Sequence, residues 1–263
     1  MRPRYAEPWT DAIELILPQA RPSPIRRVTA LTTTLEVQIL RVFADQRGEH
    51  GNELGVVYGA AGLPGDLGIE LTAHLGFSET VFVDDEPRAA FRIFTPAVEL
   101  KLAGHPTVGT AWVLGERAGG KVPAVVRPRL ATEVAAWREE DGVVWIRGAV
   151  ADAPAWEFVQ LDAPALIDEL SPDAPEQRGR HQFWAWSDES SGLIRARTFC
   201  ADMGVPEDEA TGSAAIRLAD RLQRPITVHQ GRGSVLHARP AAEAGWAQVG
   251  GRVVSDGFRS VTL

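Results

Sequence analysis

Two short glycine-containing segments carry the residue types of an anion-binding site. Gly104-His105-Pro106 and Thr211-Gly212-Ser213 each precede an apolar repeat with helical spacing, so both lie where a helix begins. The first N–H groups of a helix lack partners within the helix, and the helix dipole is positive there. Two such helix starts facing each other could hold a carboxylate. The alternative is that the glycines only shape turns, while Pro106 and Thr211 only begin or cap helices.

Repeated strand–loop–helix units are expected to position these segments. A strand ending at Phe94 leads through a loop to the Gly104 helix, and a strand ending at Phe199 leads to the Gly212 helix. This duplication predicts two similar lobes that face each other across a cleft. Further strands are expected near 37–43, 80–83, 90–94, 124–126, 134–137, 143–146 and 194–199, with helices at 67–75 and 164–170.

Composition excludes several classes of function. With 44% hydrophobic and 24% charged residues the chain is typical of a globular protein, and its net charge of −8 disfavours nucleic-acid binding. Lys101 and Lys121 are the only lysines, which disfavours a pyridoxal cofactor. The single cysteine excludes an intrachain disulfide and favours a cytoplasmic location. No apolar run suits a secretory signal or a membrane anchor.

The domain prediction has three parts. Residues 1–34 contain scattered prolines and are expected to be a poorly ordered N-terminal extension. Residues 35–126 are expected to form the first lobe, to which a C-terminal strand at about 253–263 returns. Residues 127–252 are expected to form the second lobe.

From about Leu35 to Leu263, several ordered motifs resemble those of the PhzF-like phenazine biosynthesis isomerases. The motifs are Gly51-Asn52, Ser78-Glu79-Thr80, Arg92-Ile93-Phe94-Thr95-Pro96, Glu99-Leu100, Ala103-Gly104-His105-Pro106, Gly109-Thr110-Ala111, Glu207-Asp208, Ala210-Thr211-Gly212-Ser213-Ala214-Ala215 and Gln230-Gly231. Several motifs in a fixed order are much more specific than one short pattern.

This resemblance implies an α/β fold of the α+β type, similar to diaminopimelate epimerase. Two pseudo-symmetric lobes, each a curled mixed β-sheet around a central helix, would enclose the active site between them. The resemblance also implies a small carboxylate-bearing substrate, no organic cofactor, no metal, and a homodimer. The reaction it implies is an isomerisation by proton transfer.

The resemblance also assigns roles to individual residues. Glu79 would carry the proton, and burial would bring its pKa into a range where it serves as both base and acid. His105 and Asp208 would complete the catalytic set. Substrate binding would fall to Asn52, Ser78, Gly104, Thr211, Gly212, Ser213 and Gln230. The alternatives are a surface glutamate at Glu79, a packed loop histidine at His105 and a solvated acidic turn at Asp208.

The sequence bears on three other functions. Racemases of this fold use two facing thiols, but Ala103 and Thr211 occupy the approximate thiol positions and Cys200 lies upstream. A non-catalytic binding protein of the same fold is an alternative, because Lys101 and the segment around His237 depart from the family pattern close to the presumed cleft. A lyase or tautomerase that uses Glu79 shares every sequence feature.

Overall fold

The computed structural model describes residues 33–172 and 179–263. The extension predicted at 1–34 therefore lies outside the described residues except for its last two, and Thr34 already begins the first strand. No helix within the described ranges has the length and apolar character needed to cross a membrane.

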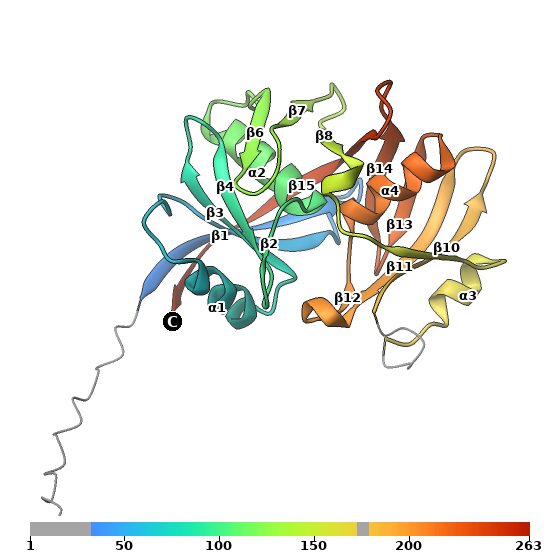
Figure 1. Ribbon diagram of the computed structural model, residues 1–263, viewed down its shortest axis with the longest axis horizontal. Coiled ribbons are helices and arrows are strands. Elements are labelled where there is room, and N and C mark those ends of the chain that lie inside the picture. Colours follow the sequence, from blue (N-terminus) through green and yellow to red (C-terminus); the bar gives the residue numbers. More distant parts are fainter. Residues whose placement is uncertain (1–32, 173–178) are drawn as a thin grey trace, which may run out of the picture. The chain divides into compact units, whose positions relative to one another are not determined.

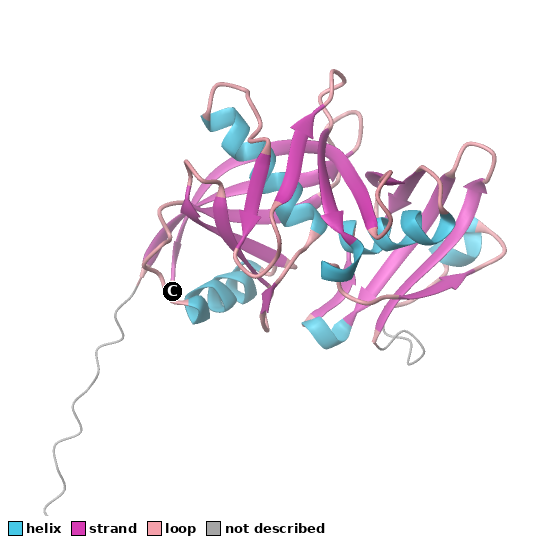
Figure 2. Cartoon of the chain, turned by 45° about the horizontal axis from the view of Figure 1, so that its top comes forward, coloured by secondary structure: helices cyan, strands magenta, loops and turns pink. Residues whose placement is uncertain are grey.

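Strands are the commonest regular elements of the described chain and far outnumber the helices, as Figure 2 shows. In the first part of the chain they are β1 (Thr34–Ala44), β2 (Asn52–Val57), β3 (Glu79–Asp85), β4 (Ala90–Phe94), β5 (Glu99–Leu100), β6 (Val125–Pro128), β7 (Val134–Arg138) and β8 (Val144–Ala149). The later strands are β9 (Glu157–Gln160), β10 (Arg180–Asp188), β11 (Leu193–Cys200), β12 (Val205–Asp208), β13 (Ile226–Gln230), β14 (Ser234–Pro240) and β15 (Trp246–Thr262).

The α-helices are α1 (Gly65–Leu75), α2 (Gly104–Arg117), α3 (Pro164–Asp168) and α4 (Gly212–Leu222). Short 3-10 helices cover Val150–Asp152 and Ala201–Met203. All four expected helices are present. Gly104 and His105 are the first two residues of α2, so this motif lies at the start of a helix. Pro106 follows in the first turn, where its missing N–H costs no helical hydrogen bond.

The strands form one continuous mixed sheet whose two long terminal strands meet. Its order runs β1-β2-β3-β4-β6-β7-β8-β15-β14-β13-β11-β10-β9, and β1 also pairs antiparallel with the C-terminal part of β15. This pairing closes the strands from β1 through β8 and β15 into a circuit. In Figure 1 the end of β15 accordingly lies beside β1 near the C-terminus.

Two buried helices form the centre of the molecule. α2 contacts strands all around the circuit, including β1, β2, β8 and β15, whereas α4 packs against β14 and β15. Most side chains of both helices are buried, so their apolar residues contribute to the main hydrophobic core. The starts of the two helices touch, because a Cβ placed on Gly104 would lie 2.5 Å from Gly212 Cα. Only glycine permits this backbone approach.

The predicted helix-plus-strand architecture agrees with this mixed fold. The C-terminal part of β15 pairs with β1. The sequence did not predict β2 or the short strands β5, β9 and β12. The predicted lobe boundary near residue 127 stays a prediction. The strands that follow it, β6, β7 and β8, belong to the same circuit around α2 as β1–β4.

Candidate active site

A cavity at the starts of α2 and α4 brings together most of the predicted site residues. The space between its lining atoms is about 400 Å³ when open solvent is included, and about 20 Å³ of it can hold the centre of a water molecule. The predicted residues that line it are Ser78, Glu79, Gly104, His105, Asp208, Thr211, Gly212 and Ser213. Residues more than a hundred positions apart in the sequence therefore share one cavity.

Glu79 and His105 face each other inside this cavity. Glu79 begins β3 and His105 lies in the first turn of α2, and both side chains are buried. Glu79 Oε2 lies 3.6 Å from His105 Nε2. Neither of these two buried atoms has a hydrogen-bond partner among the described residues. Buried polar atoms are usually paired, so this arrangement is typical of a site that completes its contacts with a ligand.

Asp208, the last residue of β12, is held by a dense set of donors. Asn52 Nδ2 donates to Asp208 Oδ1 at 2.6 Å, and Thr211 Oγ1 donates to Asp208 Oδ2 at 2.7 Å. Asn52 Nδ2 also donates to the Ala210 carbonyl at 3.1 Å. Asp208 is thus a buried and fixed carboxylate, and not part of a solvated acidic turn.

These contacts determine which nitrogen of His105 carries the proton. The Asn52 amide has two hydrogens, and Asp208 and Ala210 accept both, so His105 Nδ1, 3.3 Å away, receives none. The nearby Glu53 backbone favours a protonated ring nitrogen on His105. We therefore assign the proton of the neutral ring to Nδ1, which leaves Nε2 as an acceptor that faces Glu79.

Burial shifts the pKa values of the two acids and of the histidine in opposite directions. It lowers the pKa of His105 to about 3, so the ring is neutral near pH 7. Burial raises the pKa of Glu79, and the nearby charge of Asp208 raises it further. Burial also raises the pKa of Asp208, but the Thr211 and Asn52 hydrogen bonds oppose this. Because Asp208 has the better donors, we assign the negative charge to Asp208 and the proton to Glu79.

The helix starts supply uncompensated N–H groups beside these acids. Gly104 opens α2 and Gly212 opens α4, and neither helix has a side-chain cap. Thr211 is the N-cap residue of α4, yet its hydroxyl donates to Asp208 instead of capping the helix. The suggestion that Thr211 is only a cap is therefore wrong. The free N–H groups at both starts are suited to a carboxylate.

Asn52 and Gln230 lie behind the cavity wall and do not line it. Gln230 is fully buried, donates to the Asp208 carbonyl at 2.8 Å and accepts from the Thr211 N–H at 3.2 Å. Both residues therefore support the Asp208–Thr211 segment instead of facing a ligand.

Several lining residues were missed. Trp156 lies in the connection before β9, and its Nε1 donates to Ser213 Oγ at 3.0 Å. The available signal was an aromatic residue with an N–H donor outside any expected helix or strand. Thr95, Leu100, Ala103, Pro154, Cys200, Met203 and Val205 complete the lining. Burial and the nearby carboxyls raise the pKa of Cys200, which keeps its thiol protonated.

The structure also locates the residues that depart from the family pattern. Lys101 is exposed and adjoins the lining residue Leu100. His237 lies on β14 against another hollow, so its expected place near the cleft is wrong. A possible group of metal ligands within residues 33–172 and 179–263 is Asp45, Glu49 and His50. The last two of these are exposed, and none of the three lines the cavity.

Comparisons with known proteins agree with this fold. The family described as Phenazine biosynthesis-like protein matches residues 40–142. A Bacillus anthracis phenazine biosynthesis protein of the PhzF family superposes with a TM-score of 0.70 at 19% identity, covering 88% of this chain and all of that one. A hydroxyproline epimerase from Agrobacterium vitis gives a TM-score of 0.53 at 13% identity, covering 88% and 93%. These likenesses define the diaminopimelate-epimerase-like class of fold.

Sequence relatives identify the family within that class. The trans-2,3-dihydro-3-hydroxyanthranilate isomerase of Pseudomonas aeruginosa is 29% identical over 69% of this chain and 78% of its own length. The enzyme of the same name from Pseudomonas chlororaphis is 30% identical over 66% of this chain and 75% of its own. The chain belongs to the PhzF-like phenazine biosynthesis family and is an isomerase of that family.

Proposed function

We propose that this isomerase moves a proton between two carbons of a small, unsaturated, carboxylate-bearing substrate, with Glu79 as the proton carrier. The observation that carries the proposal is a pair of buried atoms without hydrogen-bond partners among the described residues, Glu79 Oε2 and His105 Nε2. Both residues line the cavity at the starts of α2 and α4. A substrate placed there would contact the acid directly.

The substrate carboxylate would bind the free N–H groups at Gly104 and Gly212. The cavity lining contains no lysine or arginine, so these helix starts are its main positive feature. The Trp156 ring lies in the same lining and offers an apolar surface to an unsaturated or cyclic substrate.

The proton transfer conserves the atoms of the substrate. Glu79 donates its proton to one carbon of a double bond, and the carboxylate that results removes a proton from another carbon. The double bond shifts between them, and Glu79 returns to its starting state. A carboxyl group can serve in both half-reactions only if its pKa lies near the working pH, which burial of Glu79 favours.

Neighbouring residues would support Glu79 during this cycle. With the ring proton assigned to Nδ1, His105 Nε2 accepts a hydrogen bond from the protonated carboxyl. The fixed charge of Asp208 favours the protonated form of Glu79. Asp208 would in turn orient polar groups of the substrate.

An exchange experiment tests the proposal. Wild type and Glu79→Gln are incubated in deuterium oxide with trans-2,3-dihydro-3-hydroxyanthranilate, the compound named for the relatives, and with other small unsaturated carboxylates. We expect NMR to show deuterium incorporation or product in the wild type and a loss of at least about 100-fold in the variant, the usual range for general acid–base groups. Equal exchange in both proteins would refute the role of Glu79.

A further inference from the structure

The turn before β2 (45–51) packs against the turn between β13 and β14 (231–233). Neither turn lines the cavity. His50 and Gly51 both adopt left-handed backbone conformations, with φ of 58° and 91°. The His50 ring packs on the opposite turn so closely that a Cβ on Gly233 would lie 2.5 Å from His50 Cδ2. Left-handed conformations of residues other than glycine persist where the surrounding structure holds them.

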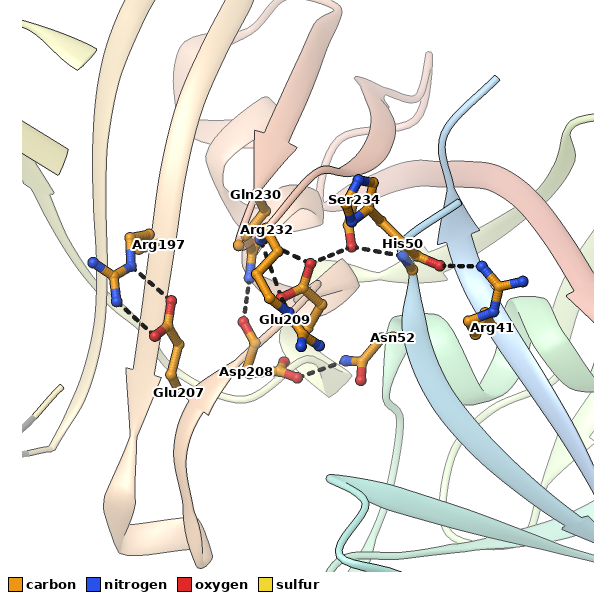
Figure 3. A network of polar contacts seen from close by, with 12 residues as sticks. Arg41, His50, Asn52, Arg197, Glu207, Asp208, Glu209, Gln230, Arg232 and Ser234 are labelled. Atoms are coloured by element: carbon orange, nitrogen blue, oxygen red, sulfur yellow. Dashed lines mark hydrogen bonds and ion pairs between the residues drawn. The ribbon is translucent and has the colours of Figure 1, made fainter. Parts of the chain in front are cut away.

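Ser234 joins these turns by a buried hydrogen-bonded bridge, shown in Figure 3. The Gly51 N–H donates to Ser234 Oγ at 3.1 Å, and the Ser234 hydroxyl donates to Glu209 Oε1 at 2.9 Å. We call these three residues the Ser234 bridge. Ser234 is completely buried, so water does not compete for its hydroxyl group.

Both ends of the Ser234 bridge are fixed by further contacts. Glu209 accepts hydrogen bonds from the Arg232 N–H at 2.9 and 3.1 Å. On the other side, Arg41 Nη1 donates to the carbonyls of Gly48 and His50 at 2.7 and 2.9 Å. The Ser234 bridge therefore connects the turn before β2 with the residue that follows β12, and other hydrogen bonds hold both of them in place.

The Ser234 bridge lies one residue away from the contact that fixes Asp208. Asn52 follows Gly51 in the chain and Asp208 precedes Glu209, and these two neighbours meet through the 2.6 Å Asn52–Asp208 hydrogen bond. Figure 3 shows both connections side by side. Each bridged residue is bonded covalently to a residue of this pair, so the bridge acts next to both ends of the Asn52–Asp208 contact.

We propose that Ser234 is a positioning residue of the active site, which sets the distance between Asn52 and Asp208 through Gly51 and Glu209. The inference rests on the proposed function for its effect on the reaction, but its effect on Asp208 can be measured independently. If the bridge is lost, Asn52 donates less strongly to Asp208. The hydrogen bond from Asn52 stabilises the charged carboxylate, so its weakening favours the protonated form.

The test compares Ser234→Ala with Ser255→Ala, a matched control. Ser255 is an exposed serine on β15 that accepts a hydrogen bond from Gln38 and does not line the cavity. The Asp208 carboxyl is followed by NMR of protein labelled with carbon-13 at aspartate, with Asp208→Asn to assign its signal. We expect the titration midpoint of Asp208 to rise by at least about half a pH unit in Ser234→Ala and to stay in place in Ser255→Ala.

Two further variants separate positioning from stability. Ser234→Thr keeps the hydroxyl and should return the midpoint towards the wild-type value. Ser234→Cys keeps a similar shape but has a weaker hydrogen-bond donor, and it should shift the midpoint upwards, but less than Ser234→Ala does. It also serves as the test if Ser234→Ala does not fold. A fall in melting temperature with an unchanged Asp208 midpoint in either variant would overturn the proposal, because the bridge would then be only structural.

Catalysis gives a separate readout. Turnover or exchange of trans-2,3-dihydro-3-hydroxyanthranilate should fall about 3–10-fold in Ser234→Ala, the effect expected for one weakened hydrogen bond. If the wild type shows no Glu79-dependent exchange, the proposed function fails while the Asp208 titration still decides the role of Ser234. An unchanged titration beside normal turnover would refute the role of Ser234 alone.

Discussion

At the scale of single residues, the site is built from groups whose protonation is displaced from that of the free amino acids. Glu79 is buried beside an anionic neighbour and retains a proton, whereas buried His105 stays neutral. The protonated Glu79 carboxyl and the neutral His105 ring each lower the free energy of unfolding over part of the pH range. The burial of the Glu79 carboxyl thus has a stability cost that can be measured.

Glu79→Gln should make the protein more stable at pH 8 and change it little near pH 4.5. The pKa of Glu79 is raised in the folded state, so above the normal glutamate pKa the folded chain binds more protons than the unfolded one. The unfolding free energy of the wild type therefore falls as pH rises, and glutamine removes this term. We expect a gain of about 1–3 kcal/mol at pH 8 in urea unfolding.

The matched control for this experiment is Glu70→Gln, a substitution of an exposed glutamate on α1. Its unfolding free energy should differ from the wild type by the same small amount at both pH values. A difference for Glu79→Gln that does not depend on pH would contradict the raised pKa.

At the scale of helices and strands, the approach of α2 and α4 fixes the geometry of the proposed anion site. Gly212→Ala would place its Cβ 2.7 Å from Gly104 Cα, and because the obstacle is backbone it cannot rotate away. We expect a loss of about 1–3 kcal/mol in unfolding free energy, as for other overpacked sites. Weaker binding of a carboxylate ligand should accompany it, measured by calorimetry.

Gly62→Ala provides the comparison, since a Cβ at Gly62 would meet nothing within 4 Å. It should alter unfolding by no more than about 0.5 kcal/mol and leave binding unchanged. If Gly212→Ala is equally well tolerated, the two helix starts can move apart and do not form a rigid site.

The sequence predicts these helices well and their surroundings less well. Apolar spacing and the glycine motifs locate α2 and α4 because both signals are local. The strands β5, β9 and β12 have two to four residues and depend on pairing with distant strands, which no local pattern records. The same limit applies to Asn52 and Gln230: a motif identifies them, but only tertiary packing shows that they lie behind the cavity.

At the scale of the whole molecule, β15 connects the strands around α2 with those around α4. Its first residues pair with β8 and β14, and from Arg252 onwards it pairs with β1. Gly251 lies between these regions, where a Cβ would be 2.4 Å from Phe43 Cδ1 and 3.2 Å from the Val235 carbonyl oxygen. A substitution at this position should therefore destabilise strands on both sides of the cavity.

Gly251→Ala should lower the protection of both sides against hydrogen exchange together. Overpacking against the backbone carbonyl and the buried Phe43 should cost about 1–3 kcal/mol, which corresponds to faster exchange in β1–β4 and equally in β11–β14. Mass spectrometry of peptic peptides measures this directly, with Gly62→Ala as the control. Faster exchange confined to one side would show that β15 joins two independently stable parts. Equal acceleration would show that the cavity is held by one cooperative unit, so that a change in either helix start is transmitted to the other.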